Sequence, residues 1–297
     1  MDDYDVFLQT WKPSALLNHS VLPQNLDDHF SRERLTADST GEADVERAEF
    51  QPGDKVMSEQ ELAARAFGYF ESHQPKWATG LRDYVIEQGL SKEKFDRYAE
   101  SFATSWVDGF ARRQNSAEML AIKASIRDFD LAFKRLPAGR FVLEPVAADI
   151  DPLFTPDEMS ILFSANSGLL EAYLSDYVDH LGSEGPSTIS DIYVRRGVMM
   201  PEIQKIRQER FELSSYSLGI GAVEQFAQLY TPRTKDTGIQ SIFSAPLPAV
   251  QNRVVAFAPF INGMDLGQLE LIVAPPIEET RLIDQGEHGG IREYGFT

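Results

Sequence analysis

The sequence predicts an α+β protein in which a helical part precedes a β-rich part. Three observations support this prediction. Between residues 58 and 135, apolar side chains recur every three or four positions, as they do on one face of a helix. From residue 189 onward, short apolar runs alternate with turn residues, which is typical of strands. The chain has 297 residues, a length that suits two domains.

Residues 1–56 are predicted to form a weakly ordered acidic tail. Residues 1–50 carry 11 acidic and 4 basic side chains, and the stretch 36–44 is small and polar. The chain starts with acidic residues, and no apolar segment typical of a secretory signal follows them. We expect a cytoplasmic location in the producing cell. A solvated leader is the simplest interpretation of the tail, and contact with a delivery chaperone for translocation into a host cell is the alternative.

Residues 57–150 are predicted to form a helical domain. A capping box that starts at Ser58 opens the first helix, and further helices are expected around 79–89, 92–112 and 115–135. Aromatic side chains form one face of the helix at 92–112, and these are Phe95, Tyr98, Phe102, Trp106 and Phe110. We interpret this face as core packing rather than a partner groove. Whether the helical domain inhibits the next domain or helps it find a target stays open.

Residues 151–297 are predicted to form a second domain that begins with a helix and continues in strands. The helix starts at Thr155, with Asp157 and Glu158 in its first turn, where negative charge suits the helix dipole. Short apolar runs predict strands at 189–194, 254–260, 269–273 and 281–283.

The composition excludes several kinds of function. The chain has no cysteine, so it has no disulfide, Cys-ligated zinc or thiol nucleophile. A net charge of −18 argues against a protein that holds nucleic acid through its phosphates. No apolar stretch approaches the ~20 residues of a membrane helix. The five histidines form no HExxH motif, so no metal site is expected, and the glycine patterns of nucleotide-phosphate loops are missing.

Two arginines at the end of a predicted strand are the first candidate for binding a ligand. Arg195 and Arg196 precede Gly197, and they are the only Lys or Arg side chains in residues 151–200, a stretch with 8 acidic residues. Arginines at a strand end are usually solvated surface charges. However, the guanidinium fork suits a pyrophosphate, and a following glycine lets a ligand approach the backbone.

Two further motifs combine serines with a carboxylate. Ser215 and Ser217 lie before a predicted helix that contains Phe226, and serines in this place commonly cap a helix. Gln268 and Glu270 alternate with leucines, so both polar side chains are expected on one face of a strand. The later part of that strand is fully apolar, which indicates that the two residues lie where a buried strand emerges at a cleft.

In order and spacing, these motifs resemble the mono-ADP-ribosyltransferases of the Arg–Ser–Glu class, which are found among bacterial toxins, type III effectors and phage enzymes. The resemblance covers about residues 155–297. It rests on Arg196-Gly197, on Ser215-Tyr216-Ser217 with Phe226-Ala227, and on Gln268-Leu269-Glu270. Ser215 follows Arg196 by 19 positions, and Glu270 follows Ser217 by 53. The resemblance implies a split β-sheet domain with helices on the outside.

The resemblance also implies a function, namely transfer of ADP-ribose from NAD to a macromolecular acceptor, expected to be a protein, by an effector or toxin that contributes to virulence. Glu270 would stabilise the cationic transition state, Ser215 would orient the carboxylate, and Gln268 would contact the acceptor. Arg196 is favoured over Arg195 for binding the NAD phosphates, because glycine follows it. The other implied NAD-binding positions are Gly197, Ser217 and Phe226. No metal is required.

The chain departs from the family pattern at three places, and two other functions stay open. Arg195 stands where the family usually has tyrosine, and Tyr216 replaces the middle threonine of the serine motif. The turn at 262–265 lacks the aromatic residue that the family often has before its last motif. These departures leave the acceptor and the identity of the NAD-binding arginine undecided. One alternative is an NAD glycohydrolase on the same fold. The other is a non-enzymatic phage or structural protein with a degenerate transferase domain.

Overall fold

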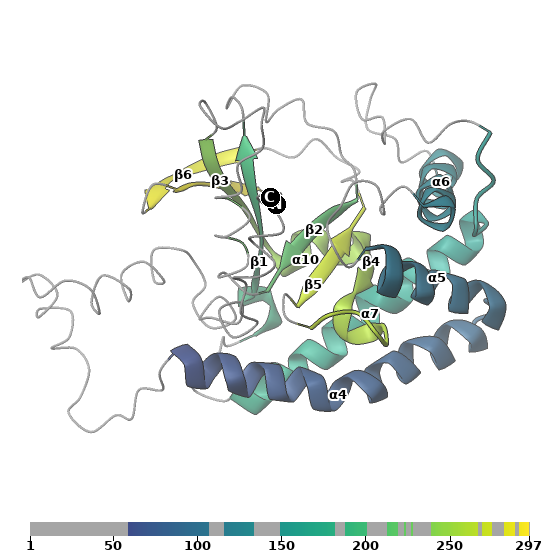
Figure 1. Ribbon diagram of the computed structural model, residues 1–297, viewed down its shortest axis with the longest axis horizontal. Coiled ribbons are helices and arrows are strands. Elements are labelled where there is room, and N and C mark those ends of the chain that lie inside the picture. Colours follow the sequence, from purple (N-terminus) through teal and green to yellow (C-terminus); the bar gives the residue numbers. More distant parts are fainter. Residues whose placement is uncertain are drawn as a thin grey trace, which may run out of the picture.

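The structure of the protein is a computed structural model, shown in Figure 1. The residues that it describes are 59–106, 116–133, 149–181, 188–200, 213–218, 223, 227, 239–266, 269–274, 282–288 and 291–296. The predicted acidic tail and the capping box at Ser58 lie outside these residues. The fold class is confirmed, since helices come first and a mixed β-sheet follows.

Four long helices form the first part of the described chain. They are α4 (Glu59–Glu87), α5 (Lys92–Ser105), α6 (Ala117–Ala132) and α7 (Pro156–Leu181). Serine caps begin two of them, because Ser91 accepts the backbone N–H of Lys94 and Ser116 accepts that of Met119. None of the helices in the described part of the chain combines the length and the apolar character that crossing a membrane requires.

Helix α4 corrects the prediction of two separate helices between residues 58 and 89. It continues through Pro75, although proline removes a helix hydrogen bond. The neighbouring Gln74 donates side-chain hydrogen bonds to the carbonyls of Ala258 and Ile261, and we infer that such tertiary contacts hold this turn in place. The helix ends at Glu87, and Gly89 follows with a φ of 104°, the left-handed conformation that commonly terminates a helix.

The seven strands of the described residues form one mixed sheet in the order β4-β5-β2-β1-β3-β7-β6. Only β3 and β7 pair in parallel. The strands are β1 (Tyr193–Met200), β2 (Ser214–Ser217), β3 (Ile239–Pro246), β4 (Val254–Phe257), β5 (Glu270–Val273), β6 (Leu282–His288) and β7 (Ile291–Phe296). Short helical turns are η4 (Ile189–Asp191), α10 (Leu247–Val250), η5 (Gln251–Arg253) and η6 (Ala258–Phe260).

The pairing between β1 and β2 is much shorter than that between β1 and β3. Strands β1 and β3 pair over eight residues, whereas the described residues of β1 and β2 pair only through Arg195 and Ser217. Figure 1 shows β2, β5 and β4 on one side of this junction, and β1, β3 and β6 on the other. The sheet is therefore one connected surface whose two halves meet at the Arg195–Ser217 pair.

Helices and sheet share one hydrophobic core. Its buried side chains extend from Phe70 in α4 to Tyr294 in β7, and Phe70 packs edge-on against Phe257 of β4. The aromatic face predicted for 92–112 enters this core with four side chains, which are Phe95, Tyr98, Phe102 and Trp106, while Phe110 lies outside the described residues. The predicted domain boundary at 150/151 lies between α6 and α7, and side chains of both helices belong to this one core.

Hydrogen bonds connect the helices to β4 and to η5, the turn before it. The carbonyl of Val255 accepts two hydrogen bonds, from the Tyr98 hydroxyl at 2.6 Å and from the Asn166 amide at 3.0 Å. Arg253 in η5 donates two hydrogen bonds of 2.9 Å to the carboxylate of Asp130 in α6. Strand β4 neighbours β5, so these contacts also fix the helices relative to β5.

Candidate active site

The candidate site lies where β5 begins beside β2. The hydroxyl of Ser215 in β2 donates a hydrogen bond to Oε1 of Glu270, the first residue of β5. Strand pairing explains this contact. Ser217 lies directly opposite Glu270 and Ser215 opposite Ile272, so the two serines and the carboxylate share one face of the sheet. The structure thus brings together two of the predicted catalytic residues, which are 55 positions apart in the sequence.

The backbone before Glu270 adopts a conformation that is uncommon for a residue other than glycine. Leu269 has a φ of 43°, in the left-handed region. Its N–H donates to the Leu266 carbonyl at 3.1 Å, and its side chain is fully buried. A buried leucine held in this region stores backbone strain of the kind found at functional sites. Leu269 directly precedes Glu270, the first residue of β5.

A second donor to Glu270 comes from the helical part and was missed by the sequence analysis. The indole Nε1 of Trp106, at the C-terminal cap of α5, donates to Oε1 of Glu270 at 2.7 Å. The sequence placed Trp106 on an aromatic core face, and its ring does pack beside Phe102. Only the three-dimensional position of α5 beside β4 shows that the N–H also reaches the carboxylate.

The surroundings of Glu270 favour the neutral carboxyl. Burial raises the pKa of Glu270 above its ordinary value, and the negative charge of Asp265 raises it further. The hydrogen bonds from Ser215 and Trp106 act in the opposite direction, because they stabilise the carboxylate. A carboxylate held by two donors in a largely dry site can stabilise positive charge that develops next to it.

The two arginines lie on opposite faces of the sheet. Arg195 is paired with Ser217, which is paired with Glu270, so Arg195 lies on the same face as the Glu270 carboxylate. Arg196, one residue on, points to the other face, where its Nη1 donates to the Ser214 hydroxyl. The sequence analysis favoured Arg196 for binding NAD, whereas the strand register places Arg195, not Arg196, on the face of Glu270.

The surroundings of the two arginines also differ. The Arg195 side chain is 1% exposed, with its Nε 3.9 Å from Oε1 of Glu293 and its guanidinium 5.5 Å from the centre of the Tyr193 ring. Arg196 is half-buried near Tyr216. Burial raises the pKa of the Tyr216 hydroxyl to about 12, and the positive charge of Arg196 limits the rise. Tyr216 therefore stays neutral at physiological pH.

Gly197 has a different role from the one that the sequence suggested. We expected it to let a ligand approach the backbone. A Cβ atom at Gly197 would lie 1.8 Å from the Val223 carbonyl oxygen and 2.7 Å from the Ala227 nitrogen, so the chain itself occupies this space. Val223 and Ala227 form a small apolar cluster with Ile242 and Ile291 over the same strands.

The other predicted site residues divide into two groups. Ser217 is buried at the junction of the two halves of the sheet, opposite both Arg195 and Glu270. Gln268 and Phe226 lie outside the described residues.

Across the part of the chain that the structure describes, no group of three or more histidine or acidic side chains is arranged to hold a metal ion.

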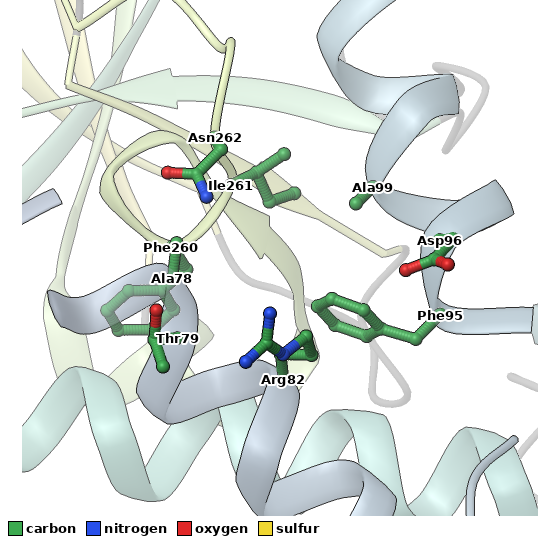
Figure 2. A pocket seen from close by; sticks show the side chains of 9 residues that line it. All are labelled: Ala78, Thr79, Arg82, Phe95, Asp96, Ala99, Phe260, Ile261 and Asn262. Atoms are coloured by element: carbon green, nitrogen blue, oxygen red, sulfur yellow. The ribbon is translucent and has the colours of Figure 1, made fainter. Parts of the chain in front are cut away.

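A separate hollow lies between α4, α5 and η6, and none of the predicted site residues lines it. Figure 2 shows Arg82 reaching into it between Thr79 and Phe95. The Arg82 guanidinium donates two hydrogen bonds to Asp83. The Asp83 carboxylate balances the charge of Arg82, and Asp96 also lines the hollow, so the hollow is poorly suited to an anion.

Comparisons with known proteins do not identify the chain, since no family model, curated protein or solved structure matches it.

Proposed function

We propose that the protein is an NAD-dependent mono-ADP-ribosyltransferase that modifies a macromolecular acceptor, most simply a protein. The observation that carries the proposal is the hydrogen bond from Ser215 to Glu270 across the β2–β5 junction, with Arg195 on the same face. Spacing in the sequence alone does not require these side chains to meet. Their contact supports the roles that the family resemblance gives them.

The proposed reaction exchanges one bond at C1′ of the nicotinamide ribose. The bond from C1′ to the nicotinamide nitrogen breaks, and the electron pair leaves with nicotinamide, which becomes neutral. The ribose passes through a transition state with positive charge shared between C1′ and the ring oxygen. A nucleophilic atom of the acceptor then forms a bond to C1′ and loses its proton to solvent. The carboxylate of Glu270 stabilises the positive charge of this transition state.

The chain's own residues would divide the work among binding, orientation and charge stabilisation. Ser215 holds Oε1 of Glu270, and no side chain of the described residues donates to Oε2. Oε2 can therefore accept a hydrogen bond from the 2′-hydroxyl of the ribose. Arg195 would bind the NAD phosphates, and Gln268 would contact the acceptor. Since Arg195 is buried beside Glu293, NAD binding requires movement of the chain that covers the guanidinium.

The proposal extends to the biological setting. The acidic composition of residues 1–50, together with the proposed transferase activity, suits an effector or toxin that is delivered into a host cell with a chaperone bound to this segment. The net charge of −18 makes a protein acceptor more suitable than a nucleic acid.

The test measures nicotinamide release from NAD by the full chain and by Glu270→Gln. The matched control is Glu87→Gln, which changes an exposed carboxylate at the end of α4. We expect Glu270→Gln to lose at least about 100-fold in rate, because the stabilising charge is gone, and the control to match the wild type. Absence of NAD consumption by the wild type, or equal rates for both variants, would refute the proposal.

A second measurement identifies the acceptor. NAD labelled on its adenosine half is incubated with the protein and a host-cell lysate, and the labelled material is then digested with protease or nuclease. Label released by protease supports a protein acceptor, and label released by nuclease contradicts it. Nicotinamide release without any labelled macromolecule would instead identify an NAD glycohydrolase.

A further inference from the structure

We propose that Trp106 is a positioning residue for Glu270, so that the helical part of the chain completes the catalytic site. This inference rests on the proposed function and deepens it. The family resemblance covers only residues from about 155 onward, so Trp106 lies outside every motif that suggested the activity. Its contribution follows from the contact between Nε1 and Oε1 alone.

The position of the indole is fixed by the packing of α5. Trp106 is 3% exposed, and its ring centre lies 6.0 Å from that of Phe102, one turn earlier. Tyr98, two turns back, donates its hydroxyl to the Val255 carbonyl in β4 at 2.6 Å. Strand β4 pairs with β5, which carries Glu270. Helix α5 is thus tied to the neighbouring strand, and its C-terminal end presents the indole N–H to the carboxylate.

A buried indole needs an acceptor for its N–H, so the contact could serve packing alone. The choice of acceptor atom gives it a further consequence. Ser215 and Trp106 both donate to Oε1. Two donors from different directions restrict rotation of the carboxylate about its last side-chain bond. They keep Oε2 on the side away from both donors, where the ribose 2′-hydroxyl would bind.

The charged groups around Glu270 determine how its titration responds to Trp106. Asp265, in the turn before β5, disfavours the carboxylate. Arg195 lies on the same face beyond Ser217, with its Nε 3.9 Å from Oε1 of Glu293. The indole N–H favours the carboxylate, and its removal therefore raises the pKa of Glu270 further. A reaction that needs the carboxylate then loses its rate at higher pH.

The first experiment compares Trp106→Phe with Trp77→Phe in the full chain. Trp77 is also buried, is stacked on Tyr173 and is not part of the site, so the control reproduces the loss of an indole from the core. For Trp106→Phe we expect kcat to fall by about 10- to 100-fold, with KM for NAD nearly unchanged. The acid limb of kcat/KM should move upward by about one pH unit. Trp77→Phe should keep the wild-type acid limb.

A second experiment tests the contact without using activity. A protein with Trp11→Phe and Trp77→Phe keeps Trp106 as its single tryptophan, and its fluorescence should change with pH as the hydrogen-bond acceptor of the indole becomes protonated. The same titration is recorded for this protein with Glu270→Gln added, which cannot titrate at this position. We expect a fluorescence step in the first protein that is missing from the second.

The two experiments separate failure of this inference from failure of the proposed function. If the wild type consumes no NAD, the proposed function falls, and the fluorescence titration alone decides whether Trp106 senses Glu270. Identical titrations with and without Glu270 would overturn the contact. A fluorescence step combined with the same acid limb in Trp106→Phe and Trp77→Phe would show that the contact exists but does not position the catalytic group.

Discussion

Substitution of Asp130 by asparagine tests whether the helices and the β-sheet form one folding unit. Arg253 donates two hydrogen bonds of 2.9 Å to the Asp130 carboxylate, and the two side chains are 4% and 8% exposed. The Arg253 guanidinium also lies 5.1 Å from the centre of the Phe163 ring in α7. Asp130→Asn keeps the shape but removes the negative charge and turns an N–H group toward the guanidinium. Breaking such a buried pair costs about 3–5 kcal/mol of unfolding free energy.

The assay is urea denaturation followed by circular dichroism. At roughly 2–3 kcal/mol per molar of urea, the expected loss lowers the midpoint by about 1–2 M. The matched control is Asp96→Asn, which breaks the pair between Lys92 and Asp96, where the side chains are 70% and 51% exposed. An exposed pair contributes within about 1 kcal/mol, so the control should retain the wild-type midpoint closely.

Two results would refute the reasoning about the shared core. One is an Asp130→Asn midpoint as close to the wild type as that of Asp96→Asn, which would mean that the buried pair has little energetic weight. The other is a separate early transition in which helix signal is lost while the sheet stays folded. A single shifted transition is expected, because the helices and the sheet bury the same apolar side chains.

Three further predictions concern the sheet junction. In steady-state kinetics, Arg195→Lys should raise KM for NAD at least about tenfold, because lysine lacks the guanidinium fork. Arg196→Lys, on the opposite face of the sheet, should change KM by less than about threefold. Gly197→Ala should lower the free energy of unfolding, measured by urea denaturation, by about 1–3 kcal/mol, because the added Cβ would collide with backbone atoms. Gly68→Ala in α4 has open space around the added Cβ and should raise the free energy of unfolding by roughly 0.5–1 kcal/mol. Because burial raises the folded-state pKa of Glu270, its stabilising contribution is present below the unfolded pKa of about 4.3 and is lost as pH rises through the folded pKa. Glu270→Gln should therefore gain stability relative to the wild type between pH 4 and pH 7, as thermal unfolding would show.

Each of these predictions has a result that would contradict it. A larger KM effect for Arg196→Lys than for Arg195→Lys would reject the assignment of faces. Equal stability of the two alanine variants would mean that the chain moves away from Gly197 without cost. A constant stability difference between wild type and Glu270→Gln across this pH range would show that burial of the carboxylate has no energetic effect.

The sequence predicted the helices better than the strands, for a physical reason. Aromatic spacing in α5 repeats with the helix period, because only one face is buried. Strand β3, at Ile239–Pro246, was not predicted, and neither was β7. In β3 the serines Ser241 and Ser244 are as buried as the apolar residues around them, so polar and apolar positions do not alternate with exposure. Without that alternation, the period-two signal of a strand is weak.

The site shows a similar division between local and long-range information. The motif around Glu270 and the one around Ser215 are local, so the sequence could suggest both residues. The choice between Arg195 and Arg196 depends on strand register, since adjacent residues point to opposite faces and one step changes the answer. The Trp106 contact joins residues 164 positions apart, and the spacing of Trp106 within α5 is that of an ordinary core residue.

The fold places several unfavourable features at Glu270, and this is consistent with the role proposed for it. The preceding Leu269 is held at a φ of 43°, and burial and Asp265 both disfavour ionisation of the carboxyl. A glycine at 269 and a glutamine at 270 would remove the backbone strain and the buried acid. The large shared core, which extends from α4 to β7, supplies the stability that allows such local costs to persist. Ser215 and Trp106 reach the same carboxylate oxygen from a strand and from a helix. This double restraint fits the proposed role, in which the orientation and charge of the carboxylate stabilise the transition state.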